Sequence, residues 1–349
     1  MDRETLCNLI SNGEQISKVD LTALDLANAD LSGGIFEEVD FSGVRLDGAA
    51  FCESIFIRCR FDNAHLKNAD FHLVSLHMCT FTSADLMGSN FTATQVSQCD
   101  FSGADFSGAD MRTAAIAQSK LNGVRFCRAN LERTAIIDAE TAGIDFSGTV
   151  LNQTVLLKAD LTSAILDGCS LETVILIESN LAGLSLRGQN LSFTQFIGAD
   201  LSGCDLSGAN LTQCNFKSAN LQGARLDGAT ANNVLFVEAR MTGTSLQRAR
   251  LYQSIFIDAE LVRVDFSGAD MRQCILTGAD CTEARFERTD LTYADFSYAN
   301  LLKANLAGAT MFRAKLHNIQ DNGAIITDRA SALGDDAELA EAENWRPVY

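Results

Sequence analysis

The sequence predicts an all-β fold in which the backbone winds as a four-sided solenoid, and three regularities predict it. A large apolar residue recurs at every fifth position from residue 16 to residue 316, with Thr141, Ala231 and Cys281 as exceptions. A small residue, usually Ala, Val, Cys, Ser or Thr, lies two positions before each large one. Similar residues also recur at intervals of twenty, and the clearest series is Phe41, Phe61, Phe81 and Phe101. A period of five fits neither an α-helix nor a strand, so the backbone must turn a corner after every fifth residue.

The interval of twenty indicates that four sides of five residues close one coil, with like residues stacked in successive coils. Each side directs one large and one small residue inward, which fills a narrow interior. Gly, Asn and Asp between these positions supply the corners. At a strand spacing of about 4.8 Å, about 15 coils would form a rod of about 70 Å. We therefore expect one continuous β-helix over residues 16–316.

The start of the chain predicts a cap for the first coil. An open solenoid end exposes unpaired backbone groups and needs a cover. Leu6, Leu9 and Ile10 have helical spacing, and Asn12 and Gly13 follow as a stop signal. We expect a short capping helix within residues 1–15.

The end of the chain loses the five-residue pattern after Leu316. Residues 324–327 form a short apolar run that predicts a last cap strand. The acidic segment 331–349 predicts a tail with a short helix from Asp335 to Asn344. Residues 317–349 are therefore expected to hold a cap and a C-terminal tail.

Composition narrows the classes of function. Hydrophobic residues make up 47% of the 349 residues, and the formal net charge is −18. A charge of this sign opposes direct binding to nucleic-acid phosphates but permits a basic partner, or imitation of DNA. The chain has no apolar run long enough for a membrane helix and no leader at its start. We expect no membrane contact and a cytoplasmic location, or export by a system that needs no leader.

Residues capable of chemistry do not form a catalytic or metal site in this register. Eight of the eleven cysteines occupy inward positions, where they act as small apolar fillers: Cys59, Cys79, Cys99, Cys169, Cys204, Cys214, Cys274 and Cys281. His65, His72 and His77 fall on three different outward sides, so they cannot share one metal ion. The many carboxylates lie on flat sides, whereas acid–base catalysis needs a shielded concave site. We expect no enzyme activity, no cofactor and no metal.

One side of the predicted coil differs from the others. Its centres lie at 16, 36, 56 and onward to 316, and aliphatic residues flank many of them. On the other three sides the flanking residues are mostly Asp, Asn, Arg, Ser and Thr. β-propensity by itself would place aliphatic residues on all four sides. We therefore predict a partner-binding face made by Ile137, Val155, Leu157, Ile175, Ile177, Ile197, Leu235, Val237, Ile255, Ile257 and Ile275.

Two further features bear on partner binding. Charged residues often follow the centres of this side by two positions and would form a polar rim. Pairing of two such faces in a homodimer would bury only about 700 Å², below a standard interface, so flanking contacts are also needed. Trp345 and Tyr349 in the tail are candidates for a docking motif.

The motif Ala-(Asp/Asn)-(Leu/Phe)-(Ser/Thr)-Gly resembles the pentapeptide repeat family. Residues 29–33 and 199–203 carry it in full, and the resemblance extends over residues 16–316. It implies a right-handed quadrilateral β-helix whose Leu/Phe centres point inward. It also implies a non-catalytic role in binding other proteins.

The resemblance suggests two specific roles. Residues 9–21 resemble modules that accompany bacterial type VI secretion, which implies an accessory or effector-loading scaffold. The alternative is a DNA mimic that binds DNA gyrase or a topoisomerase, as some members of the family do. The acidity fits this alternative, whereas the length and the acidic tail fit it less well.

Overall fold

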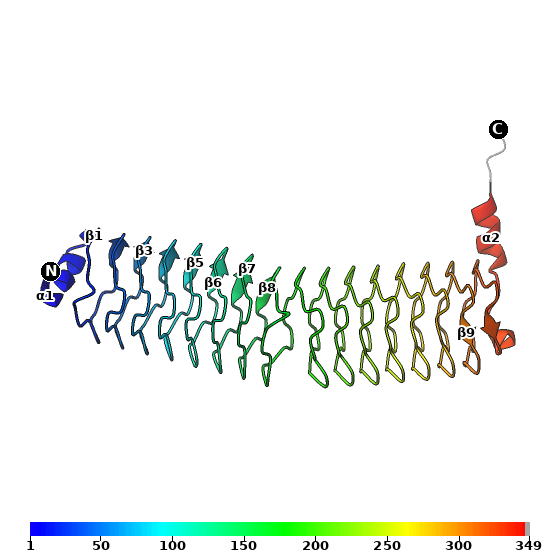
Figure 1. Ribbon diagram of the computed structural model, residues 1–349. Helices are drawn as coiled ribbons and strands as arrows, with labels where there is room; N and C mark the ends of the chain where they lie inside the picture. Colours follow the sequence, from blue (N-terminus) through cyan, green and yellow to red (C-terminus); the bar gives the residue numbers. More distant parts are fainter. Residues whose placement is uncertain (346–349) are drawn as a thin grey trace. The chain divides into compact units, whose positions relative to one another are not determined.

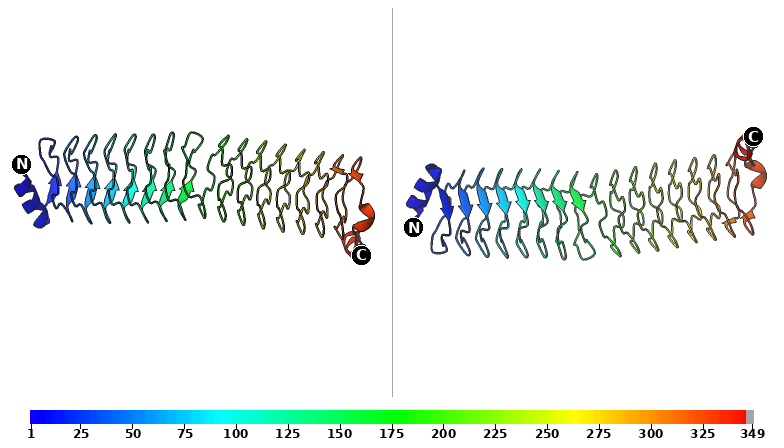
Figure 2. Two further views of the ribbon diagram at one scale, coloured as in Figure 1. Left: turned by 90° about the horizontal axis from the view of Figure 1, so that it is seen from below. Right: turned by 90° about the horizontal axis from the view of Figure 1, so that it is seen from above.

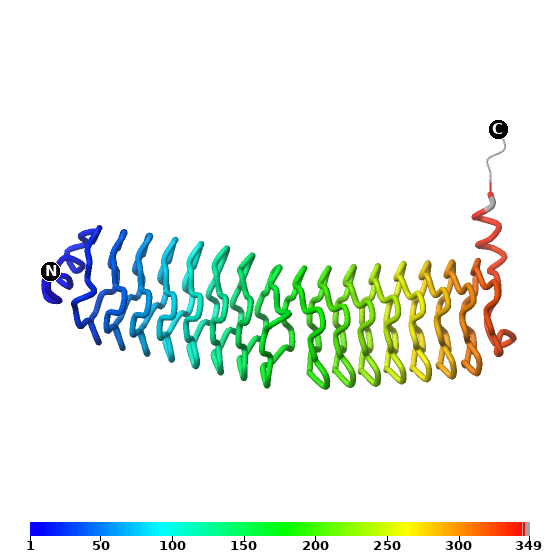
Figure 3. The backbone as a smooth tube through the Cα atoms, viewed as in Figure 1, coloured from blue at the N-terminus to red at the C-terminus, as the bar shows by residue number. Residues whose placement is uncertain are grey.

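The computed structural model describes residues 1–345, and the chain divides into two compact units, Met1–Asn180 (unit 1) and Leu181–Tyr349 (unit 2). Each unit is a parallel β-solenoid in which residues twenty apart pair in successive coils (Figure 3). The predicted fold class is therefore confirmed. A single continuous β-helix over residues 16–316 stays a prediction, because the strand and bridge pairs join residues of the same unit.

We name the four sides of a coil by their buried centres. Side A has its centres at residue 16 and every twentieth residue thereafter. The centres of sides B, C and D begin at 21, 26 and 31, respectively. In all four series nearly every centre is buried, and the residues just before and after it face outward.

Unit 1 begins with the predicted capping helix, α1 (Arg3–Ser11). The Asp2 carboxylate accepts a hydrogen bond of 2.8 Å from the Thr5 N–H and so caps the first turn. Leu6 and Ile10 are buried on one face of the helix. The chain leaves the helix through Gly13, which has a left-handed φ of 74°.

Side A of unit 1 forms one eight-stranded parallel sheet with its strands in chain order (Figures 1 and 2). Each strand pairs in register with the strand twenty residues later, as Ile16 does with Phe36. The strands are β1 (Gln15–Ser17), β2 (Ile35–Glu37), β3 (Ile55–Ile57), β4 (Ser75–His77), β5 (Gln95–Ser97), β6 (Ala115–Ala117), β7 (Ala135–Ile137) and β8 (Val155–Leu157).

The corners depend on two recurring devices. An Asp or Asn before a centre accepts a hydrogen bond from the N–H two residues later, as Asp20 does from Thr22 at 2.9 Å. The residue two after the centre adopts a left-handed φ, for example 70° at Gly33 and 54° at Glu38. The sequence predicts Gly, Asn and Asp here, but Lys, Glu, Arg and Gln also occupy such corners. The repeated hydrogen bonds compensate for the cost of this conformation.

The interior is layered. Phe61 and Phe81 stack with their ring centroids 4.5 Å apart, and Phe101 stacks on Phe81 at 4.7 Å. Many small polar residues inside donate a hydrogen bond to the preceding coil, and others, such as Ser89, donate within their own coil. The Thr94 hydroxyl, for example, donates to the carbonyl oxygen of Phe71 at 2.7 Å. This explains how Ser, Thr and Cys share the small inward position with Ala.

Unit 2 pairs its coils mainly through single-residue bridges, as between Leu235 and Ile255. Its last coils contain the parallel pair β9 (Asn305–Leu306) and β10 (Ile325–Ile326), which confirms the predicted cap strand. The ladder continues beyond the last centre, because the Leu316 N–H donates to the Leu333 carbonyl oxygen at 2.9 Å.

A one-turn 3-10 helix (η1, Arg329–Ser331) and the helix α2 (Ala337–Asn344) follow, and α2 lies within the predicted 335–344 segment. The Asp336 carboxylate caps α2 by accepting from the N–H groups of Glu338 and Leu339, both at 3.1 Å. Within residues 1–345, neither helix is long and apolar enough to cross a membrane.

Candidate interaction surface

The predicted residues of unit 1 lie together on side A and form what we call the unit 1 stripe. Its members are Ile137, Val155, Leu157, Ile175 and Ile177. Ile137 pairs with Leu157, and Val155 pairs with Ile175 in the next coil. Each side chain faces outward and is half-buried, because its neighbours along the column cover part of it.

The predicted residues of unit 2 occupy the same two columns of side A and form the unit 2 stripe. Leu235, Ile255 and Ile275 bridge one another in successive coils. Leu235 is 37% exposed, and the other members are half-buried. Asn215 and Lys217 interrupt the stripe. Its members are Ile197, Leu235, Val237, Ile255, Ile257 and Ile275.

The two stripes have different charged margins, made by residues two after each centre. In unit 1, Lys158 Nζ lies 3.7 Å from Asp138 Oδ1 and 4.0 Å from Glu178 Oε2. This margin carries both signs of charge. In unit 2 the margin holds Glu238, whose Oε1 lies 3.9 Å from Lys217 Nζ in the preceding coil, and Asp258, which has no ion pair within residues 1–345. The unit 2 margin is therefore acidic.

The tail candidates are not brought to either stripe. Trp345 follows the last residue of α2 and is 72% exposed. Tyr349 lies outside the described residues. A docking role for these two residues stays a prediction.

Sequence reasoning missed an exposed group of aromatic and arginine side chains on side D of unit 2. The Arg272 guanidinium lies over the Tyr252 ring at 5.7 Å from its centroid, and Arg313 lies over Tyr293 at 5.9 Å. Phe312 packs its ring edge against Tyr293 at 5.7 Å. Tyr and Arg are enriched where proteins bind one another. The signal was present as aromatic residues one or two positions after side D centres.

The eight inward cysteines are buried, as the register predicts. All eleven cysteines are free. Burial raises the pKa of the Cys214 thiol to about 12 and that of the Cys204 thiol to about 11. A thiol with so high a pKa stays protonated at neutral pH and is a poor nucleophile or metal ligand.

The histidines are separated, also as the register predicts. His72 Nδ1 lies 2.7 Å from the Thr92 hydroxyl on side D, and His77 Nδ1 lies 2.8 Å from the Ser97 hydroxyl on side A. Across residues 1–345, no group of three or more His, Cys, Asp or Glu side chains is placed to hold a metal ion.

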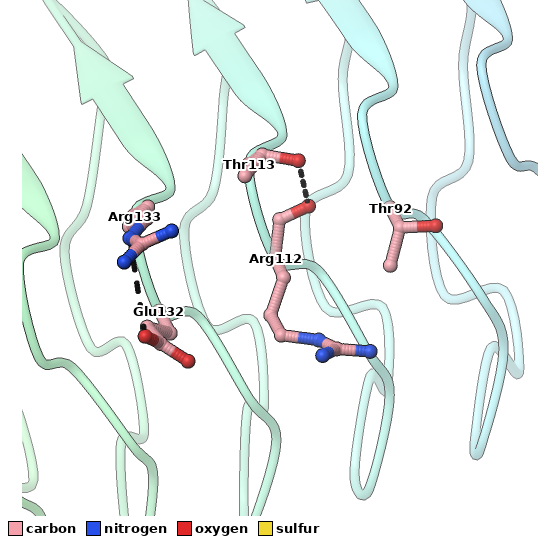
Figure 4. Close-up of a pocket in the computed structure, with 5 residues that line it drawn as sticks. All are labelled: Thr92, Arg112, Thr113, Glu132 and Arg133. Atoms are coloured by element: carbon pink, nitrogen blue, oxygen red, sulfur yellow. Dashed lines mark hydrogen bonds and ion pairs between the residues drawn. The ribbon is translucent and has the colours of Figure 1, made fainter.

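One surface depression of unit 1 holds charges that are already paired. This depression of about 300 Å³ on side D is lined by Thr92, Arg112, Thr113, Glu132 and Arg133 (Figure 4). Arg133 Nε lies 3.9 Å from Glu132 Oε1, and Arg112 is bound by Asp110 at 2.6 Å. The two hydroxyls that line it both donate to oxygen acceptors, that of Thr92 to Asn90 Oδ1 at 2.7 Å and that of Thr113 to the Arg112 carbonyl oxygen at 2.6 Å.

The chain belongs to the pentapeptide repeat family. The model described as "Pentapeptide repeats" matches in eight copies, and that described as "Pentapeptide repeat region" matches residues 54–136. The eight copies cover residues 20–56, 142–177, 176–208, 194–230, 219–256, 235–273, 254–292 and 289–320. No curated protein sequence matches the chain.

Solved structures of repeat proteins are similar to this chain. HetL, a pentapeptide repeat protein involved in heterocyst differentiation regulation in the cyanobacterium Nostoc sp. strain PCC 7120, is 19% identical. The match covers 93% of this chain and 100% of HetL, with a TM-score of 0.31. QnrB1, a plasmid-mediated fluoroquinolone resistance protein, is 25% identical over 52% of this chain and 87% of its own, with a TM-score of 0.34. A pentapeptide repeat protein of the Arabidopsis thaliana thylakoid lumen is 28% identical over 34% of this chain and 68% of its own, with a TM-score of 0.14.

Proposed function

We propose that this protein is a non-catalytic scaffold that binds a protein partner, or a second copy of itself, through the aliphatic stripes on side A. The observation that carries the proposal is the placement of these residues. They face outward from an ordered backbone, where a polar residue would serve the fold equally well. Burial of their apolar surface by a partner is favourable by about 25 cal/mol per Å².

The surroundings of the stripes support this role. Each stripe has a charged margin on one side, which resembles the polar rim of a protein interface. The backbone beneath is held by hydrogen bonds between coils, such as that of 3.0 Å from the Lys158 N–H to the Ile177 carbonyl oxygen. A rigid surface loses little conformational entropy on binding, which favours affinity.

The test replaces two neighbours in the unit 1 stripe, Leu157→Asp and Ile177→Asp. Both side chains face outward, so we expect the circular dichroism spectrum and melting curve to stay close to those of the wild type. Association should be lost, measured by analytical ultracentrifugation for a homodimer and by co-purification from the source organism for another partner.

The matched control places the same two charges on side B, as Ala142→Asp and Thr162→Asp, which are exposed positions in neighbouring coils. The control should keep its partner. If the side A pair unfolds the protein, the stripe belongs to the core. If the side A pair associates like the wild type, the proposed function is wrong.

The alternative role, a DNA mimic that binds gyrase or a topoisomerase, is favoured by the net charge of −18. Arginines interrupt the acidic columns, however. On side C, Arg125 lies 3.4 Å from Asp105, and Arg45 lies 3.3 Å from Asp25. Such pairs weaken any likeness to a continuous row of phosphates. A gyrase supercoiling assay separates the two roles, because a mimic inhibits the enzyme and a scaffold of other proteins does not.

The type VI secretion setting rests on the resemblance of residues 9–21 and is the narrower form of the scaffold proposal. It predicts co-purification with a secretion effector, and the side A pair should abolish that co-purification. Loss of effector secretion in a strain that keeps the secretion machinery but lacks this protein would support the same setting.

A further inference from the structure

The end of unit 2 carries a cleft that the repeat pattern does not predict. The cleft has a volume of about 520 Å³ and is formed where α2 meets side A. Its lining includes Thr277, Ser297 and Lys315 from side A, and Leu333 and Leu339 from the last part of the chain. In Figure 1, α2 rises from the last coils of unit 2 instead of continuing the solenoid.

The wall made by α2 is held near both of its ends by one buried side chain. His317 is only 4% exposed, and its Nδ1 accepts a hydrogen bond of 3.1 Å from the Asp336 N–H at the start of α2. Its Nε2 lies 3.4 Å from Glu343 Oε1 in the last turn. The Tyr298 hydroxyl donates to the same Glu343 carboxylate. These contacts fix α2 against side A, so the cleft is a built feature of the unit.

The cleft continues the unit 2 stripe. Thr277, which lines the cleft, lies in the coil after Ile257 and in the same column of side A. Ile275 bridges Asp295 in the following coil. Leu333 and Leu339 add apolar surface, at 44% and 41% exposed. From the coil of Leu235 to that of Lys315 is four steps of about 4.8 Å, or about 19 Å in all.

The charge around this surface is negative. Asp258, which has no ion pair within residues 1–345, lies at one margin beside Glu238, which is paired with Lys217 at 3.9 Å, and the Asp335 side chain is 75% exposed at the cleft. The cation inside the cleft, Lys315, is already bound to Asp295 at 3.2 Å. α2 adds further exposed carboxylates in Glu338 and Glu341. An occupant therefore meets an apolar floor from Leu235 to Ile275, then a polar floor of Thr277, Ser297 and Lys315 beside the apolar wall of Leu333 and Leu339, with acidic edges.

We propose that this surface binds a short amphipathic helix of a partner protein, with its apolar face on the stripe and Lys or Arg residues along its flanks. The inference rests on the proposed function and adds the chemistry of the partner. A helical turn rises 5.4 Å, close to the spacing of the coils, so each turn of the guest meets about one coil. About 13 helical residues span the 19 Å floor. A second copy of α2 does not fit, because its sequence AELAEAEN carries three glutamates and no basic residue.

The test measures binding of a synthetic 14-residue helical peptide, with leucines on one face and lysines on its flanks, by fluorescence anisotropy. The control peptide has glutamate in place of every lysine. We expect the lysine peptide to bind the full-length protein and the glutamate peptide not to bind. Ile257→Asp and Leu339→Asp should each weaken binding of the lysine peptide by roughly tenfold or more. Val262→Asp, an outward position on side B of the same unit, should leave binding unchanged.

The sign of these effects separates a defined site from general attraction between opposite charges. Each Asp variant makes the protein more negative, so general attraction predicts binding equal to or tighter than that of the wild type for all three. That result, or no binding of the lysine peptide, overturns the inference. The proposed function would then still stand if Leu157→Asp plus Ile177→Asp loses the native partner, because that test uses unit 1 and no peptide.

Discussion

Side A is built differently in the two units. In unit 1 its first eight coils form three-residue strands, whereas in unit 2 single bridges alternate with turns. The difference lies in the small inward residue three positions after the centre. In unit 2 its N–H donates to the centre of its own coil, as Ala239 does to the Phe236 carbonyl oxygen at 3.1 Å. In unit 1 the N–H can instead reach a side chain of the next coil, as Cys79 reaches Cys99 Sγ at 3.3 Å.

A side-chain acceptor in the next coil favours a strand, whereas its absence favours a turn closed within one coil. The same contact recurs in the following coil, where the Cys99 N–H donates to Ser119 Oγ at 3.1 Å. Val19, Ser119 and Ala139 also follow strands although the next coil offers only Val39, Ala139 and Ala159, so neighbouring coils also impose the strand geometry. In unit 2 this position is alanine in the coils from Ala199 to Ala299, and none of these side chains offers an acceptor.

The margins of the stripes differ as well, with consequences for binding. The mixed charges around Lys158 in unit 1 suit a partner of mixed charge, including a second copy. The acidic margin of Glu238 and Asp258 in unit 2 suits a basic partner. The same aliphatic columns can therefore select different partners in the two units.

The largest effect is expected from a charge in the core of unit 1. Phe81→Asp buries an unpaired carboxylate between Phe61 and Phe101 and removes two ring stacks, so the free energy of unfolding should fall by about 4 kcal/mol or more. Urea denaturation followed by circular dichroism measures it. Met78→Asp, at an exposed left-handed corner, should change stability by less than about 0.5 kcal/mol. Equal effects would mean that the inward register is wrong.

An intermediate effect is expected from the N–H groups that distinguish the side A strands of unit 1 from the side A turns of unit 2. Ser119→Ala removes the acceptor of the Cys99 N–H and leaves that group buried and unpaired, at a cost of about 1–3 kcal/mol. Ala239→Ser should cost less than about 1 kcal/mol, because the Ala239 N–H is already bonded within its own coil. Urea titrations of both variants compare the units directly. A larger loss of stability from Ala239→Ser than from Ser119→Ala would contradict this explanation of the strands and turns.

A smaller effect is expected from acid. The Thr22 hydroxyl and N–H lower the pKa of Asp20 in unit 1, and the Arg272 guanidinium lowers that of Asp270 in unit 2. A carboxyl whose folded pKa is lowered stabilises the fold above its unfolded value, 3.8 here, and loses that contribution as the pH falls through the folded pKa. Melting temperatures should therefore decline below pH 3.8. Asp270→Asn should show a shallower decline, and a steeper one would contradict this assignment.

The smallest effect is expected at the margins. Lys158→Met removes two exposed ion pairs of unit 1, and Asp258→Asn removes an unpaired charge of unit 2. Each should change the free energy of unfolding by less than about 0.5 kcal/mol, because exposed charges are well screened by water. A loss above about 1 kcal/mol in either variant would show that the margin serves the fold and not a partner.

The solenoid could be predicted because its signal is local and repeated. A large apolar residue at every fifth position marks the inward position of each side. Side A and its aliphatic columns therefore follow directly from the register. The difference between the side A strands of unit 1 and the side A turns of unit 2 could not be predicted. It depends on whether the next coil offers a hydrogen-bond acceptor, as Ser119 does for Cys99. The cleft at α2 was missed for a related reason. It depends on contacts of His317 and Tyr298 with Glu343, which no periodicity links.

The most direct test of the central claim is photo-crosslinking in the organism that encodes this protein. A benzophenone amino acid placed at Leu157 or Ile257 reports on side A, and one placed at Ala142 or Val262 reports on side B of the same units. The account predicts a discrete crosslinked product, with another protein or with a second copy, from the side A positions only. Equal products from both sides, or products from side B alone, would contradict it.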